Sequence, residues 1–168
     1  MFYKPPGLVC TSNTQAKHNI LDYIGHEKNL TPIGKMSKES EGLIILTDES
    51  ISNTKVRQIL GAEQEYMINL NQKISMEMII ALEKGFTRKG KRYPKCKAKR
   101  INKTALNIKI RNTDDGLIKI MCHALGYRVK QMIRIKYGNI SLGKLKMGKW
   151  KNLNHNEIQR VRSLFSKS

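Results

Sequence analysis

The chain has 168 residues, of which 32 are Lys or Arg and 13 are Asp or Glu, so its formal net charge is +19 at pH 7. This length suits a single domain, spanning residues 1–168, with its own hydrophobic core. The charge excess predicts a polyanionic partner, with nucleic acid ahead of an anionic membrane. Because the sequence has no apolar run of about 18 residues, we expect no membrane-spanning helix and no membrane partner.

The cysteines and histidines give no sign of a metal or disulfide framework. Cys10, Cys96 and Cys122 are scattered and form no CxxC pair, and the four histidines lack metal-ligand spacing. We therefore expect no metal site and a reducing compartment, which is the cytoplasm or an organelle. No secretory signal peptide is apparent at the N-terminus.

The first half of the chain predicts short elements around one buried strand. Residues 19–24 indicate a short helix. The unbroken apolar run at 43–46 is typical of a strand that is buried on both faces. A helix is predicted over 51–60, ending at Gly61, and the alternation at 65–70 predicts a second strand.

The second half begins with a helix that Ser75 caps and Gly85 ends. Residues 87–100 are strongly basic and contain Pro94, which favours a loop followed by an edge strand. Alternating apolar residues at 106–110 predict a half-buried strand.

The last third predicts a turn at 112–116, a helix at 117–125 and a strand at 129–136, followed by a final helix that Asn154 caps. Strands and helices do not alternate strictly. The fold class is therefore α+β, with a mostly antiparallel mixed sheet flanked by helices.

Five segments, in order along the chain, carry a family resemblance. They are Lys4-Pro5-Pro6-Gly7, the stretch 34–43 that reads GKMSKESEGL, the strand 65–68, the stretch 121–127 that reads MCHALGY, and parts of 140–150. Together they resemble the bacterial ribosomal RNA pseudouridine synthases of the RsuA/RluE/RluF branch. The resemblance implies a pseudouridine-synthase-like domain.

The resemblance also implies a reaction, in which uridine within RNA becomes pseudouridine without a cofactor or metal. The target base is flipped out of its stack. In the family an aspartate carboxylate acts on the ribose, an arginine pairs with that aspartate, and a tyrosine packs on the base. On this resemblance the catalytic positions are Ser37, which replaces the aspartate, Tyr66, and Lys119, which replaces the arginine.

These two replacements make the enzymatic activity uncertain. A serine hydroxyl is neutral at pH 7 and needs a neighbouring base to act as a nucleophile. Two carboxylates are close in sequence, but Asp48 is expected to cap a helix and Glu39 to be structural. The sequence therefore predicts an RNA-binding protein with impaired isomerisation. The alternatives are an active synthase acting on rRNA or tRNA, and a basic domain that docks on an acidic protein.

Basic side chains near the motifs and in two further segments are the predicted RNA contacts. The segment 88–100 holds eight basic residues with Tyr93 among them, and Lys130, Arg134 and Lys136 alternate along one strand. The predicted RNA-binding residues are Lys4, Lys35, Lys38, Arg88, Lys89, Lys91, Arg92, Lys130 and Arg134. For the lone Trp150, core packing is favoured over base stacking.

The predicted partner is ribosomal RNA or a ribosomal particle. Much of the family carries an N-terminal RNA-binding module that we expect to be absent here. A protein partner is the candidate source of that module.

Overall fold

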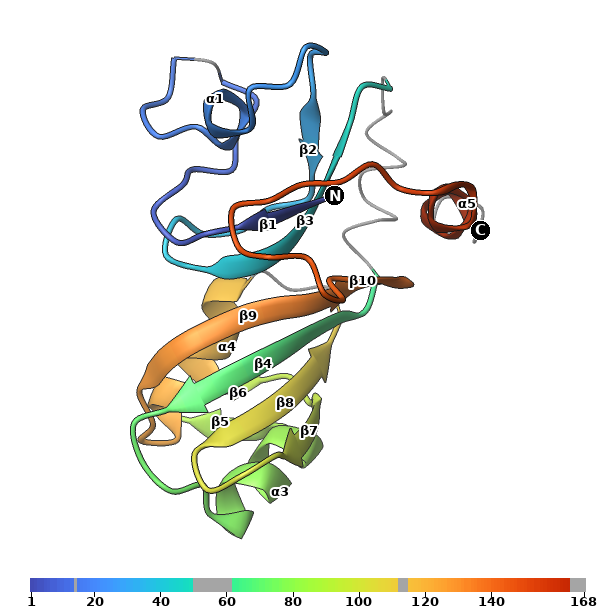
Figure 1. The fold of residues 1–168 in the computed structure, drawn as a ribbon. Helices are drawn as coiled ribbons and strands as arrows, with labels where there is room; N and C mark the ends of the chain where they lie inside the picture. Colours follow the sequence, from blue (N-terminus) through green and yellow to red (C-terminus); the bar gives the residue numbers. More distant parts are fainter. Residues whose placement is uncertain (14, 50–61, 112–114, 164–168) are drawn as a thin grey trace.

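The computed structural model describes residues 1–13, 15–49, 62–111 and 115–163. An eight-stranded sheet dominates it, with the central order β1 (Phe2–Lys4), β3 (Glu41–Thr47), β9 (Val129–Tyr137), β4 (Gln64–Leu70), β8 (Ala105–Ile110) and β7 (Lys97–Arg100) (Figure 1). The short strands β2 (Thr31–Ile33) and β10 (Ile140–Ser141) pair with β3 and β9. The pairing of β3 with β9 is parallel, and the other described pairings in this sheet are antiparallel. The α+β prediction is confirmed.

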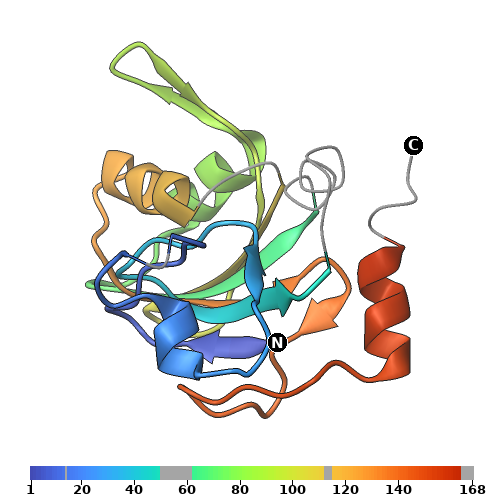
Figure 2. The same cartoon turned by 90° about the horizontal axis from the view of Figure 1, so that it is seen from above.

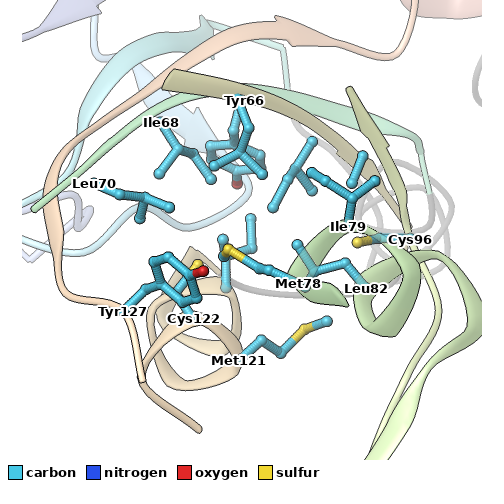
Figure 3. Packing of buried hydrophobic residues seen from close by; sticks show 14 of the residues in the cluster. Tyr66, Ile68, Leu70, Met78, Ile79, Leu82, Cys96, Met121, Cys122 and Tyr127 are labelled. Carbon is cyan, nitrogen blue, oxygen red and sulfur yellow. The ribbon is translucent and has the colours of Figure 1, made fainter. Parts of the chain in front are cut away.

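Two helices cover one face of the sheet. Helices α3 (Met76–Lys84) and α4 (Asp115–Ala124) pack their apolar sides on strands β4 and β8 (Figure 3). The Ser75 hydroxyl accepts the Met78 amide at the start of α3, as predicted. The small helix α1 (Ile20–Ile24) and the C-terminal helix α5 (His155–Arg162) lie beside the other part of the sheet (Figure 1).

Strand β3 is buried on both sides, as its apolar run predicts. Leu43 and Ile45 join one hydrophobic cluster, while Ile44 joins another with Phe2 of β1 and Ile20 of α1. This double burial fixes the loop of residues 34–40, which leads directly into β3.

Glycine is required where β3 meets β9. Gly42 has a φ of +117°, and a Cβ atom there would lie 2.4 Å from the carbonyl oxygen of Arg134. A side chain at this position would therefore collide with the backbone of the neighbouring strand.

Three sequence predictions need correction. Strand β8 is almost wholly buried rather than half-buried: its polar Asn107 is buried and donates to Glu65 of β4, and Lys109 alone in the strand stays partly exposed. Residues 115 and 116 belong to α4 and not to a turn, since the helix begins at Asp115. In the basic segment, β5 (Phe86–Arg88) and β6 (Lys91–Tyr93) form a hairpin where a loop is predicted.

Other predictions have a simpler outcome. The edge strand predicted before residue 100 is β7, and the predicted final helix is α5, with a capping box between Asn154 and Glu157. The predicted helix at 51–60 and the start of the predicted turn, 112–114, lie outside the described residues. Among the residues that are described, no helix is long and apolar enough to cross a membrane.

Candidate functional site

Lys4 pins the loop that contains Ser37. Its side chain is 0% exposed, and its Nζ donates to the carbonyl oxygens of Pro5, Lys38 and Ser40 at 3.0, 3.1 and 2.7 Å. Burial lowers the pKa of Lys4 to about 8. The predicted surface contact between Lys4 and RNA is thus corrected, because this ammonium group is occupied inside the protein.

Ser37 is bonded to a carboxylate from a distant part of the chain. Its backbone N–H and its hydroxyl both donate to Oδ2 of Asp115, each at 2.9 Å, and its Oγ lies 2.8 Å from the Oγ of Ser40. Asp115 is the first residue of α4 and is 3% exposed. A carboxylate therefore lies beside the position that the family motif assigns to aspartate, but it comes from a helix 78 residues further along the chain.

The Asp115 carboxylate is held in its charged form. Burial raises its pKa, but hydrogen bonds from Ser40 and from the amide and hydroxyl of Ser37, with the nearby Arg134 guanidinium, outweigh burial and leave the pKa below its ordinary value. At neutral pH this group is therefore an ionised acceptor that binds the loop to the helix, and a low pKa makes it a weak base.

Arg134 connects the loop that contains Ser37 to Tyr66, the tyrosine of the motif, by way of Gln64. It is 1% exposed; its Nε donates to the Leu43 carbonyl at 2.8 Å, and its Nη1 donates to the Lys35 carbonyl and to Gln64 Oε1, both at 3.1 Å. Gln64 Oε1 also accepts the Tyr66 hydroxyl at 2.6 Å. Within the described residues, the buried Nη2 of Arg134 has no hydrogen-bond partner.

The prediction that Lys130, Arg134 and Lys136 form a basic surface along β9 is therefore wrong at Arg134. Lys130 is exposed and Lys136 is half-buried, whereas Arg134 lies inside the protein. An alternating pattern places residues 134 and 136 on one face, but the loop of residues 34–40 covers that face at Arg134.

Tyr66 is 1% exposed and belongs to the main hydrophobic cluster, where Figure 3 shows it above the residues of α3 and α4. Lys119 lies on α4 one turn after Asp115, and lines a cleft of about 470 Å³ together with Glu39, Glu41 and Lys130. Among the described residues, no hydrogen bond or ion pair joins Lys119 to Ser37 or Asp115. Arg134 thus connects the loop of Ser37, through the Lys35 carbonyl, to Gln64 and Tyr66, whereas Lys119 lies in the adjacent cleft.

The carboxylates that the sequence offered as substitutes, and the nearby Cys10 thiol, do not replace the aspartate at Ser37. Asp48 forms an exposed ion pair with Lys28 at 2.6 Å, beyond the far end of β3. Glu39 lines the cleft with Lys119. Burial raises the pKa of the Cys10 thiol to about 11, so this thiol stays protonated at neutral pH and is a poor nucleophile.

Sequence reasoning missed Asp115, Gln64 and Ser40. The signal for Asp115 was an acidic residue where a helix begins, which is common for helix stability alone. Gln64 could have been found from the two-residue period of β4, which places it on the same face as Tyr66.

The remaining predicted RNA contacts are exposed. Lys35 and Lys38 lie on the loop of residues 34–40, and Arg88, Lys89, Lys91 and Arg92 lie on the β5–β6 hairpin, which projects from the body of the protein (Figure 2). Phe86 and Tyr93 stack at the base of the hairpin with ring centroids 4.7 Å apart. These aromatic rings stiffen a basic arm that solvent surrounds.

Comparison with known proteins gives consistent relatives, although no family model matches the chain. The chain is 32% identical over 156 residues to the dual-specificity RNA pseudouridine synthase RluF of Escherichia coli K12, covering 92% of this chain and 54% of that protein. It is 30% identical over 138 residues to an uncharacterized RNA pseudouridine synthase of Aquifex aeolicus, covering 77% and 54%. The chain thus spans about half the length of these relatives.

A solved structure supports the same assignment at the level of the fold. A crystal structure of pseudouridylate synthase superposes with a TM-score of 0.83 and 22% sequence identity, covering 95% of this chain and 71% of the other. By its sequence likeness to RluF over 92% of its length and by this shared fold, the chain is a relative of the RNA pseudouridine synthases and has a pseudouridine-synthase-like fold.

Proposed function

We propose that this protein binds structured RNA, with ribosomal RNA as the first candidate, and that it does not isomerise uridine by the aspartate route of its family. The observation that carries the proposal is the bond from the Ser37 hydroxyl to Asp115. The group at the aspartate position is neutral, and its one proton is donated to a neighbouring carboxylate.

The chemistry explains why this change matters. Isomerisation breaks the C1′–N1 bond of uridine, forms a C1′–C5 bond, and moves a proton from C5 to a base while N1 gains one. The family uses an aspartate carboxylate to act on the ribose. Here the nearest carboxylate, Asp115, already accepts bonds from the Ser37 amide and hydroxyl, and Tyr66 is buried under its own strand and helices.

Binding needs only groups that the surface still presents. The net charge of +19, the exposed loop residues Lys35 and Lys38, and the projecting β5–β6 hairpin support contact with a phosphate backbone. Relatives named as an RNA pseudouridine synthase and as a ribosomal large subunit pseudouridine synthase make rRNA, free or in a ribosomal particle, the first candidate.

One observation favours a second candidate function, an active synthase. Oδ2 of Asp115 lies 2.9 Å from the Ser37 Oγ, close to where the carboxylate of the family aspartate is expected. Asp115 could therefore supply the carboxylate that position 37 lacks. In this candidate Asp115 takes the role of the aspartate on the ribose, which requires Ser37 to release it when RNA binds.

Tritium release from RNA labelled at C5 of uridine separates the two functions. We expect the wild-type protein to bind labelled rRNA fragments and release no tritium. Release by the wild type that disappears in Asp115→Asn would establish the second candidate. Asp22→Asn, on the surface of α1, is the matched control for loss of one acidic group.

A reconstruction tests whether the pocket is otherwise intact. Ser37→Asp is combined with Asp115→Asn and Lys119→Arg, so that only one carboxylate occupies the pocket. Gain of tritium release by this triple variant would attribute the lost activity to these positions. Wild-type release that survives Asp115→Asn would contradict both functions. Turnover is compared at equal RNA binding, measured by fluorescence anisotropy.

We place the protein in a reducing compartment, the cytoplasm first, because Cys10, Cys96 and Cys122 are all free thiols.

A further inference from the structure

Trp150 is exposed, which corrects the prediction that it packs in the core. It is the one tryptophan of the sequence, and the residue is 43% exposed to solvent. Its ring meets His26 edge-on, with centroids 5.1 Å apart, and its backbone bridges to Phe2. Trp150 is thus held in place by its backbone and one ring neighbour while part of the indole faces solvent.

A cavity of about 370 Å³ opens beside this ring. Its walls include Trp150, His26 and Lys151, and its floor is apolar, with Ile33, Ile45 and Val161. We call it the Trp150 groove. It lies at the C-terminal end of β3, whereas Ser37 precedes the N-terminal end of that strand, so the groove is separate from the site around Ser37.

A lysine-rich segment reaches the groove at Lys151, which lines it and pairs with Glu157 at 3.0 Å. Lys144, Lys146, Lys149 and Lys151 are exposed and fall within eight residues of chain. The lining also includes Asp48 and Glu49, which pair with Lys28 and Arg162. Charge therefore favours a phosphate chain along residues 144–151 and disfavours it beside Asp48 and Glu49.

We propose that the Trp150 groove binds an unpaired base of single-stranded RNA, with the base against the Trp150 ring and the flanking phosphates on the lysines of 144–151. The inference extends the RNA binding proposed above and depends on it. An exposed ring beside an apolar recess suits a planar base, since every base has a π-face. The row of lysines suits a polyanion and not an apolar or basic protein segment.

The exposed Tyr23 provides a second aromatic ring near the lysines of residues 144–151. It is 53% exposed, and its hydroxyl would lie 2.7 Å from a Cβ at Gly148, so it packs against the lysine-rich segment. The proposed path of the RNA along residues 144–151 therefore passes a second exposed ring.

The lone tryptophan is its own probe in the decisive experiment. Oligouridylate of about ten nucleotides is added to the wild-type protein while Trp150 fluorescence is recorded, with inorganic polyphosphate of equal charge as the control. We expect quenching of the indole emission, and its protection from iodide, with oligouridylate but not with polyphosphate. Stacking on an aromatic ring predicts about tenfold weaker binding of labelled oligouridylate to Trp150→Ala, and a smaller loss in Trp150→Phe.

Ile120→Ala, at an exposed apolar residue of α4, is the matched control and should bind as the wild type does. Oligouridylate binding with unchanged fluorescence, and with equal affinity for Trp150→Ala, would overturn the groove and leave RNA binding elsewhere intact. A wild type that binds no RNA of any kind would overturn both proposals. If Trp150→Ala does not fold, the wild-type quenching and iodide protection decide alone.

Discussion

The two ends of β3 present opposite environments. At the N-terminal end, the half-buried Ser37 donates to the buried Asp115, and the buried Arg134 donates to the Lys35 carbonyl of the same loop. At the C-terminal end, the Trp150 groove is open and is flanked by exposed lysines. The family motif points to the first end, while exposure and charge point to the second. In this chain, therefore, the surface that we propose for RNA lies apart from the position that the family motif assigns to the catalytic aspartate.

The largest expected effect is at the closed end. Arg134→Met removes three hydrogen bonds and leaves the Leu43 and Lys35 carbonyls and Gln64 without this donor. We expect about 3–5 kcal/mol less stability in urea unfolding, the range for a broken buried charge network. Lys130→Met, four residues earlier on β9 and exposed, should change stability by less than about 0.5 kcal/mol. Equal effects of the two variants would mean that the cluster is not a stabilising unit.

The next effect is the coupling between Ser37 and Asp115. We expect Asp115→Asn to reduce the free energy of unfolding by about 1–3 kcal/mol, since it weakens two bonded acceptor contacts. Ser37→Asp should destabilise the protein more than Ser37→Ala at pH 7, because two carboxylates about 3 Å apart cannot both ionise without repulsion.

A double-mutant cycle measures that coupling. Asp115→Asn should rescue Ser37→Asp, giving a double variant that is more stable than Ser37→Asp alone. Simple additivity of the two substitutions would show that the pocket accepts two carboxylates, contrary to the expectation.

The contribution of Asp115 ionisation to the free energy of unfolding is expected to be smaller than the two effects above, and the direction of its pH dependence follows from the lowered pKa. Its pKa is lowered in the folded protein, so the unfolded chain binds this proton at a higher pH than the folded one does. The stabilisation is complete above the unfolded pKa of about 3.9 and is lost as pH falls through the folded value. The stability difference between wild type and Asp115→Asn, from urea melts at pH 7 and at about pH 3, should narrow at the lower pH. The same stability difference at both pH values would show that Asp115→Asn acts through altered packing and not through loss of the charge.

The smallest effect on stability is expected at the β5–β6 hairpin. Replacing Arg88, Lys89, Lys91 and Arg92 by Gln should leave the unfolding curve unchanged within about 0.5 kcal/mol. The slope of log affinity for RNA against log salt should fall by roughly 0.7 for each phosphate contact that is lost. Lys84→Gln, on α3, is the single-charge control. An unchanged slope would remove the hairpin from the RNA contacts.

Local patterns predicted the elements whose signals are local. The Ser75 cap and the Gly85 end bounded α3 correctly, and the apolar run at 43–46 identified β3 as buried on both faces. The resemblance supplied the fold, because five motifs in order constrain the topology more than any one element does.

Long-range contacts could not be predicted in the same way. Asp115 meets Ser37 across 78 residues, and no periodicity in either segment indicates that meeting. Arg134 alternates with exposed lysines, so its burial depends on a loop that packs on it from elsewhere. The hairpin strands β5 and β6 have three residues each, too few for alternation to stand out in a basic segment.

The parallel joint between β3 and β9, the one parallel pairing in the described sheet, divides it into two groups of strands. Gly42 lets the two backbones approach there, and the guanidinium of Arg134 spans the joint, holding Leu43 on one side and Gln64 on the other. Separating β3 from β9 would remove hydrogen-bond acceptors from the buried Arg134 guanidinium. The RNA that we propose as ligand would therefore meet a surface that is already formed, and we expect association to be governed by electrostatic encounter and ionic strength rather than by closure of the protein around its ligand.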